Sequence, residues 1–162
     1  MKTDRRERTC KIHKQGKEAK NQLIIPSFLK NLKESNVAFT IGKFTLHQGI
    51  GLTSLAGLTD APFRRLCRSF GAEWVVGEML SSNLRLSRTY KSLQRRLHWC
   101  EESPVVVQLL GENPKEMAEA ARYYEGEGAD VIDLNFGCPL KKVCQKGEGA
   151  ALCCAIYLVC GQ

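Results

Sequence analysis

The chain has 162 residues, of which 43% are hydrophobic and 25% charged, and its formal net charge is +7. This composition is typical of one globular domain and excludes the disordered, collagen-like and fibrous classes. No segment reaches the roughly 20 apolar residues of a membrane-spanning helix, and the basic N-terminus lacks the apolar core of a secretory signal. We therefore expect a cytoplasmic protein with no membrane partner.

The positive charge is concentrated in two blocks, which indicates a polyanionic partner because surface Lys and Arg attract phosphates. One block lies in the N-terminal leader and contains Lys2, Arg5, Arg6, Arg8, Lys11, Lys14, Lys17 and Lys20. The other, between Glu78 and Glu101, contains Arg85, Arg88, Lys91, Arg95 and Arg96. A solvated tail and a solvated surface are the alternative interpretations of these blocks.

The eight cysteines have no regular spacing and predict free thiols in a chain without an export signal. No pair has the Cys-x-x-Cys spacing of a zinc knuckle, and the three histidines lie far apart in the sequence. We expect no structural metal.

Residues 1–45 are polar and aperiodic, and we interpret them as a basic, mobile leader that leads into a short hairpin around Phe44-Thr-Leu46. From Ile50 onward, apolar runs alternate with amphipathic stretches. That alternation predicts strand-helix units in a parallel sheet.

The first unit is predicted to run from a strand at 51–56 through a turn into a helix. Asp60 is a suitable N-cap, Pro62 suits the first turn, and Gly71 can end the helix. The helix is expected to bury one apolar face at helical spacing, consisting of Phe63, Leu66, Cys67 and Phe70.

Two further strands are predicted by the apolar runs at 74–79 and 105–110. The second of these is a continuous apolar run of the kind buried on both faces, interrupted by the amide of Gln108. The following helix is predicted to begin after Asn113, with Pro114 in its first turn, and to break at Gly126 and Gly128.

A fourth strand is predicted at 130–136. Parallel strands of this kind fit either an open doubly wound sheet or the first half of a β/α barrel. Neither glycine fingerprint of the open-sheet nucleotide folds is present. The sequence therefore favours an α/β fold that is a partial (β/α)8 TIM barrel, comprising about its first half.

Cys138 is the candidate catalytic residue, because it follows the fourth strand at the position where a β/α barrel displays reactive groups. Gly137 lets the backbone approach a ligand closely, and Pro139 fixes the turn, so that the thiol between them points in one direction. The alternative for Cys138 is a small buried hydrophobe at a strand end.

The segment from about Ile50 to Leu152 resembles the tRNA-dihydrouridine synthases of the bacterial type. The resemblance is carried, in chain order, by Leu55-Ala-Gly-Leu-Thr-Asp-Ala-Pro-Phe-Arg64, Gly77-Glu-Met79, Ser81-Ser-Asn83, Val107-Gln-Leu-Leu-Gly111, Asn113-Pro-Lys-Glu-Met-Ala118, Asp133-Leu-Asn-Phe-Gly-Cys-Pro-Leu-Lys-Lys-Val143 and Gly149-Ala150.

The resemblance implies a β/α barrel that carries FMN and reduces the C5–C6 double bond of a uridine in tRNA, with NADPH as the reductant of the flavin. It implies that Cys138 is the general acid that protonates C5, and that Asn135 hydrogen-bonds the flipped uracil. Lys141 and Lys142 are expected to contact tRNA phosphates.

The resemblance also implies four contacts with the flavin. Backbone groups of Ser54, Leu55 and Ala56 are expected to contact FMN, and the amide of Gln108 is expected to meet the polar edge of its ring. This sequence has Ser54 and Leu55 where the family usually has Pro and Met.

A complete β/α barrel typically has about 250 residues. The resemblance therefore identifies the chain as an N-terminal fragment of the catalytic barrel, and we expect a monomer with three segments: a leader (1–45), a half-barrel (46–152) and a divergent apolar tail (153–162). Two alternatives stay open, namely a non-catalytic RNA-binding remnant of the same family and another FMN-dependent barrel oxidoreductase.

Overall fold

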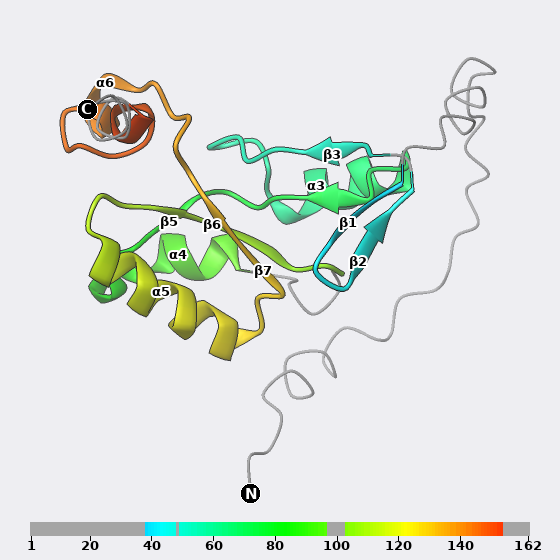
Figure 1. Cartoon of the computed structure of the whole chain (residues 1–162), viewed down its shortest axis with the longest axis horizontal. Helices are drawn as coiled ribbons and strands as arrows, with labels where there is room; N and C mark the ends of the chain where they lie inside the picture. Colours follow the sequence, from blue (N-terminus) through cyan, green and yellow to red (C-terminus); the bar gives the residue numbers. More distant parts are fainter. Residues whose placement is uncertain (1–37, 48, 97–102, 154–162) are drawn as a thin grey trace, which may run out of the picture.

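The computed structural model describes residues 38–47, 49–96 and 103–153, so that residues 1–37 of the predicted leader and most of the predicted tail lie outside the described residues (Figure 1). The described elements, in chain order, are β1 (Phe39–Ile41), β2 (Phe44–Leu46), β3 (Gly51–Leu52), α3 (Ala61–Ser69), β4 (Trp74–Val75), β5 (Leu80–Ser81), the 3-10 helix η2 (Leu84–Leu86), α4 (Tyr90–Arg95), β6 (Val106–Leu110), α5 (Pro114–Glu127), β7 (Val131–Leu134) and α6 (Lys141–Cys144).

The strands after the hairpin are parallel and are paired in the order in which they occur in the chain. β3 pairs with β4, and β5 pairs with β6, which pairs with β7. A bridge between Val76 and Val106 joins the two groups. In the commonest doubly wound sheet the fourth strand pairs with the first, whereas here β7 pairs with β6. This order is the one that a barrel requires, although the described strands do not close into one.

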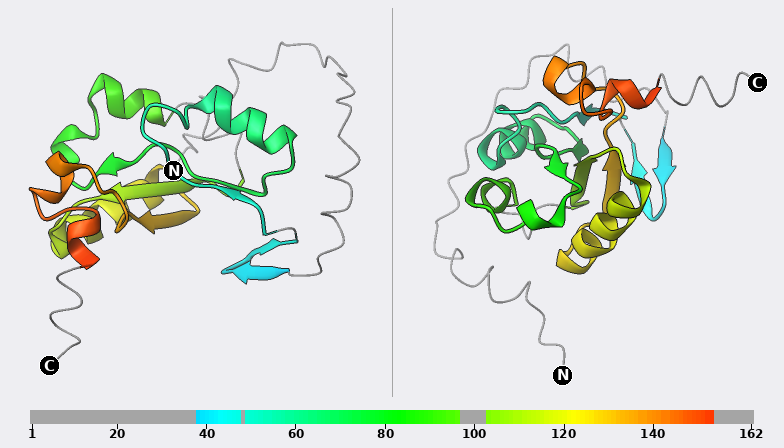
Figure 2. Two further views of the ribbon diagram at one scale, coloured as in Figure 1. Left: turned by 90° about the horizontal axis from the view of Figure 1, so that it is seen from above. Right: turned by 90° about the vertical axis from the view of Figure 1, so that its left-hand side faces the viewer.

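Helices α3, α4 and α5 lie around one side of the strands when the molecule is seen end-on (Figure 2, right). The main core lies between strands β5, β6 and β7 and helix α5, and its buried residues are Leu80, Val105, Val107, Leu109, Ala120, Tyr124 and Ala129. Tyr124 is 1% exposed, and burial raises the pKa of its phenol above 10.0.

The predicted hairpin is present as the antiparallel pair β1–β2, and it lies at the end of the molecule where the parallel strands begin (Figure 1). Lys43 in its turn lies 3.5 Å from a carboxylate oxygen of Asp130, immediately before β7. The backbone N–H of His47 donates to Glu73, immediately before β4. The loops that follow the parallel strands lie at the opposite end of the molecule, where these strands finish.

The predicted strand at 51–56 is too long, because β3 ends at Leu52. The carbonyl of Leu55 accepts hydrogen bonds from the N–H groups of Leu58 and Thr59, and these bonds close a turn instead of extending the ladder. The predicted strand at 74–79 is likewise interrupted, since β4 ends at Val75 and β5 begins at Leu80.

The apolar face predicted for the first helix is not the buried face of α3. Phe63, Leu66 and Phe70 are exposed, whereas Ala61 and Arg64 are buried, and Cys67 is half-buried. Ala61 and Arg64 are one helical turn apart, so they also form a continuous face. Arg64 is 1% exposed, and its guanidinium donates to the carbonyl of Thr59 at 2.8 Å, which helps this charged side chain to be buried.

The caps and the ends of the helices agree closely with the sequence. Asp60 accepts a hydrogen bond from the N–H of Phe63, and Asn113 caps α5 through Lys115 and Glu116. Gly71 and Gly128 follow α3 and α5 with φ angles of 102° and 111°, in the left-handed region. The predicted break at Gly126 is wrong, because one internal glycine costs only about 1 kcal/mol and α5 continues through it.

Candidate active site

Three of the predicted site residues come together where β6 and β7 end. The side-chain Nδ2 of Asn135 donates to Oε1 of Gln108 at 2.8 Å, and its Oδ1 accepts from the backbone N–H groups of Gly137 and Cys138 at 3.1 and 3.0 Å. Nε2 of Gln108 donates to Asp133 at 2.7 Å. The loop that carries the Cys138 thiol is therefore tied to two neighbouring strands.

The loop is also held from its other side by the segment that returns after α6. The N–H of Ala150 donates to the carbonyl of Cys138 at 3.1 Å, and the Cys144 thiol contacts the same carbonyl at 3.6 Å. Gly149 has φ +61°, and a Cβ at this position would lie 2.7 Å from the Cys138 carbonyl oxygen. The half-buried Cys138 is thus enclosed between Asn135 and the 149–150 backbone.

The residues predicted to contact the flavin through the first strand lie in a turn closed by Thr59. Leu55 uses its N–H and its carbonyl for this turn, because the Thr59 hydroxyl accepts from the former and donates to the latter, both at 3.1 Å. Ser54 is half-buried, and Leu55 and Ala56 are exposed. Thr59 itself is 0% exposed, and sequence reasoning did not single it out.

Glu78 joins this turn to the next strand, and it was also missed. Its Oε2 accepts from the N–H of Gly57 at 3.0 Å and lies 3.4 Å from Nε of Arg95. Arg95 also donates to the carbonyl of Met79 at 2.7 Å. The signal in the sequence was the Gly-Glu-Met motif itself, but the partners of Glu78 lie 21 and 17 residues away, so the chain order does not reveal them.

Two of the basic residues expected to face a polyanion are instead used within the fold. Arg95 pairs with Glu78, and Arg96 lies 3.1 Å from Glu127 and over the Tyr124 ring. Both guanidinium groups are therefore engaged in ion pairs within the fold, whereas the other basic residues of this block are exposed. Arg85, Arg88 and Lys91 are exposed on η2, α4 and the loop between them, and Lys141 and Lys142 are exposed at the start of α6.

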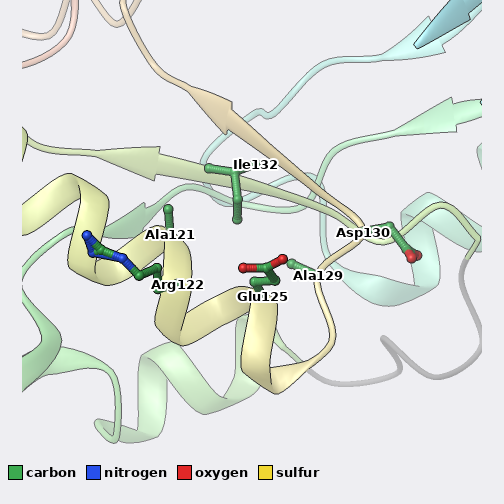
Figure 3. Close-up of a pocket in the computed structure, with 6 residues that line it drawn as sticks. All are labelled: Ala121, Arg122, Glu125, Ala129, Asp130 and Ile132. Atoms are coloured by element: carbon green, nitrogen blue, oxygen red, sulfur yellow. The ribbon is translucent and has the colours of Figure 1, made fainter. Parts of the chain in front are cut away.

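A pocket of about 300 Å³ lies elsewhere, between α5 and the beginning of β7 (Figure 3). Its lining residues are Ala121, Arg122, Glu125, Ala129, Asp130 and Ile132. Cys138 lies beyond the other end of β7, so this pocket does not belong to the thiol site.

Three further findings on the described residues concern free cysteines, metal sites and membrane-spanning helices. Cys67, Cys138, Cys144 and Cys153 are free thiols. In residues 38–47, 49–96 and 103–153 no three His, Cys, Asp or Glu side chains gather as a metal site would require. None of the helices in that part of the chain is long and apolar enough to cross a bilayer.

Ser54, Ala56 and Gln108 offer the kinds of donor and acceptor groups that contact with the polar edge of a flavin ring would require. Ser54 and Ala56 make no hydrogen bond with any described residue, so their backbone groups stay available at the end of the first strand. Gln108 donates one amide N–H to Asp133 and has a second. The Cys138 loop is linked to Gln108 through Asn135, which accepts from the N–H of Cys138 and donates to Oε1 of Gln108.

Comparisons with known proteins connect this geometry to one family. The family model described as "Dihydrouridine synthase (Dus)" matches residues 52–161. A tRNA-dihydrouridine synthase B from Pseudomonas syringae pv. tomato is 47% identical over 115 residues, which cover 71% of this chain and 34% of that protein. Its counterpart from Pseudomonas aeruginosa is 48% identical over 112 residues, covering 69% of this chain and 34% of that protein. The chain spans about a third of the length of these curated relatives.

Proposed function

The chain belongs to the dihydrouridine synthase family, and on this premise we propose that it carries part of the site at which a tRNA-dihydrouridine synthase reduces uridine to 5,6-dihydrouridine. The observation that supports this most directly is the position of Cys138. Its loop follows the end of a parallel strand and is held by Asn135 on one side and by Ala150 on the other. A proton donor benefits from such fixation, because general acid catalysis requires the donor within hydrogen-bonding reach of the reacting atom.

In the proposed reaction C6 of the uracil would take up a hydride, which is the chemistry that bound FMN, reduced by NADPH, would supply. The Cys138 thiol gives its proton to C5 from the opposite face, and the thiolate then recovers a proton from solvent. Ser54, Ala56 and Gln108 are the residues proposed to hold the flavin edge. Leu55 would contribute through its exposed side chain, since its N–H and carbonyl serve the turn with Thr59.

Asn135 is proposed to have two roles: it holds the Cys138 loop, and it hydrogen-bonds the uracil. Its Oδ1 already accepts two backbone N–H groups, and its Nδ2 donates to Gln108 and, more weakly, to Sδ of Met79 at 3.6 Å. A uracil oxygen could replace the Met79 contact, which is the weakest of these interactions, without releasing the Cys138 loop.

The tRNA is proposed to dock through exposed cations that follow the thiol in the chain and through others on η2, α4 and the loop between them. Lys141 and Lys142 begin α6, three and four residues after Cys138. Arg85, Arg88 and Lys91 are the exposed members of the second basic block. Contacts of this kind set affinity and orientation, while the flipped base is recognised inside the site.

The proposal is tested by expressing this chain in cells whose tRNA lacks dihydrouridine and measuring that nucleoside by mass spectrometry. Cys138→Ala is expected to lower dihydrouridine formation by about 10²- to 10⁴-fold, the usual contribution of a general acid. Cys67→Ala, which removes another half-buried thiol, is the matched control and should retain activity. Equal dihydrouridine content with and without the Cys138 thiol would refute its proposed role.

Flavin absorbance of the purified chain separates the enzyme from an RNA-binding remnant. A yellow protein supports the FMN site, whereas a colourless chain that binds tRNA with a strong salt dependence supports the remnant. The exposed cations are the only feature of the described residues that favours a non-catalytic RNA-binding remnant. Binding of an RNA backbone does not require the Cys138 loop or the side-chain amides of Asn135 and Gln108.

A further inference from the structure

The hydrogen bonds around Cys138 begin at Asp133, which is not among the site residues predicted from the sequence. Asp133 and Gln108 are direct partners in the register of β6 and β7, and their side chains are joined at 2.7 Å. Gln108 is 7% exposed, so few waters can substitute for this bond. We propose that Asp133 is a positioning residue that sets the direction of the whole chain of amide hydrogen bonds holding the Cys138 loop.

The direction follows from the chemistry of the groups. An ionised carboxylate can only accept hydrogen bonds, so Gln108 must turn its Nε2 toward Asp133. Oε1 of Gln108 then faces Asn135 and can only accept, which turns Nδ2 of Asn135 toward it. Oδ1 of Asn135 is left facing the N–H groups of Gly137 and Cys138, which need an acceptor.

A flip of either amide is therefore unfavourable at both of its contacts. With Gln108 reversed, its oxygen would face the Asp133 carboxylate and its NH₂ would face the NH₂ of Asn135. With Asn135 reversed, its NH₂ would face two backbone donors. The carboxylate at one end and the two N–H groups at the other select the same arrangement, and the bonds polarise one another in this partly buried site.

The relevance of this arrangement to catalysis rests on the proposed function, but the arrangement itself can be measured without flavin or tRNA. The readout is the hydrogen-exchange rate of the Gly137 and Cys138 amides, followed by NMR on the whole chain. In Asp133→Ala the exchange of both amides is expected to accelerate by roughly three- to tenfold, which corresponds to losing a hydrogen bond of ordinary strength.

Asp130→Asn is the matched control. Asp130 immediately precedes β7, and its carboxylate contacts Lys43 and the N–H of Val105 instead of the amide chain. Its substitution removes the same charge near the same strand. The exchange rates at Gly137 and Cys138 should stay at their parent values.

A pH profile distinguishes this role from a general loss of packing. Gln108→Glu places two carboxylates in contact, and such a pair shares one proton because the pKa of one member is raised. At low pH the protonated pair can still donate to Asp133 and accept from Asn135, so the two amides stay protected. As the pH rises through the raised pKa, both carboxylates ionise and repel, and protection is expected to fall.

The double variant Asp133→Asn with Gln108→Glu should restore the chain. The amide at 133 then donates to the carboxylate at 108, which also accepts from Asn135, and only one acidic group is left. Protection of Gly137 and Cys138 should return to within about twofold of the parent and should no longer fall as the pH rises, because no second carboxylate is left to repel the first.

The exchange rates of the Gly137 and Cys138 amides in these variants decide whether Asp133 positions the Cys138 loop. Parent-like exchange in Asp133→Ala, or a double variant that is folded but unprotected, overturns it. If Asp133→Ala does not fold, the double variant decides alone: parent-like protection supports the proposal, and failure to fold or to protect overturns it. Failure of the dihydrouridine assay with normal exchange behaviour would refute the proposed function and leave the positioning role of Asp133 intact.

Discussion

Gly149→Ala is the substitution whose cost can be worked out most directly from the geometry around Cys138. Gly149 has φ +61°, and an alanine in the left-handed region costs about 1–2 kcal/mol. Its Cβ would lie 2.7 Å from the Cys138 carbonyl oxygen and 3.0 Å from both Cβ of Cys138 and Cγ1 of Val143. Forced contacts of this kind cost about 1–3 kcal/mol, so we expect a total loss of about 2–5 kcal/mol in the free energy of unfolding.

Gly42→Ala provides the matched control, since Gly42 has φ +56° and nothing within 4 Å of the added Cβ. Its cost should be the backbone term alone, about 1–2 kcal/mol. Urea unfolding of the two variants, compared at equal m-values, measures the difference. Peptide-resolved alkylation of Cys138 detects a loop that opens locally instead. If Gly149→Ala changes neither stability nor Cys138 alkylation more than Gly42→Ala does, the close packing against Cys138 is refuted.

Three other predictions concern the core, a helix cap and the exposed cations. Burial raises the pKa of Tyr124, so folding favours the protonated phenol. The stability that this contributes is present below pH 10.0 and is lost as the pH rises further. Tyr124→Phe should therefore reduce the fall in the free energy of unfolding at alkaline pH, measured by urea titration. Asn113→Ala removes the cap of α5 and should cost about 1 kcal/mol by the same titration, whereas no change would contradict the capping geometry. Replacing Arg85, Arg88 and Lys91 with Gln should lower the slope of log affinity for tRNA against log salt by about 0.7–0.9 for each phosphate that the variant no longer neutralises, and an unchanged slope would place the tRNA elsewhere.

The features that the sequence predicted correctly depend on short stretches of chain. A cap such as Asp60 or Asn113 acts on N–H groups two or three residues away, and a glycine such as Gly128 ends a helix through its own φ angle. The parallel strand-helix order is also readable, because each apolar run is flanked by its own turn signals. The boundaries of the strands were less predictable, since a ladder ends where the partner strand ends.

The packing of α3 shows why periodicity was insufficient for the first helix. Two faces of this helix have helical spacing, one apolar and one that contains Ala61 and Arg64, and the sequence favoured the apolar face. The structure buries the other, because the Thr59 carbonyl accepts a hydrogen bond from the Arg64 guanidinium. A partner from outside the helix settled the choice, and no pattern within the helix identifies that partner.

One part of the candidate site follows from residues that are neighbours in the chain, and the other part follows from the tertiary structure. The sequence by itself determined that Asn135, Gly137 and Cys138 share one loop after a strand, because neighbours in the chain stay neighbours in the fold. Only the tertiary structure decided that Gln108 and Asp133 face each other, since that pairing depends on the register between β6 and β7, in which a shift of one residue would turn each side chain to the opposite face.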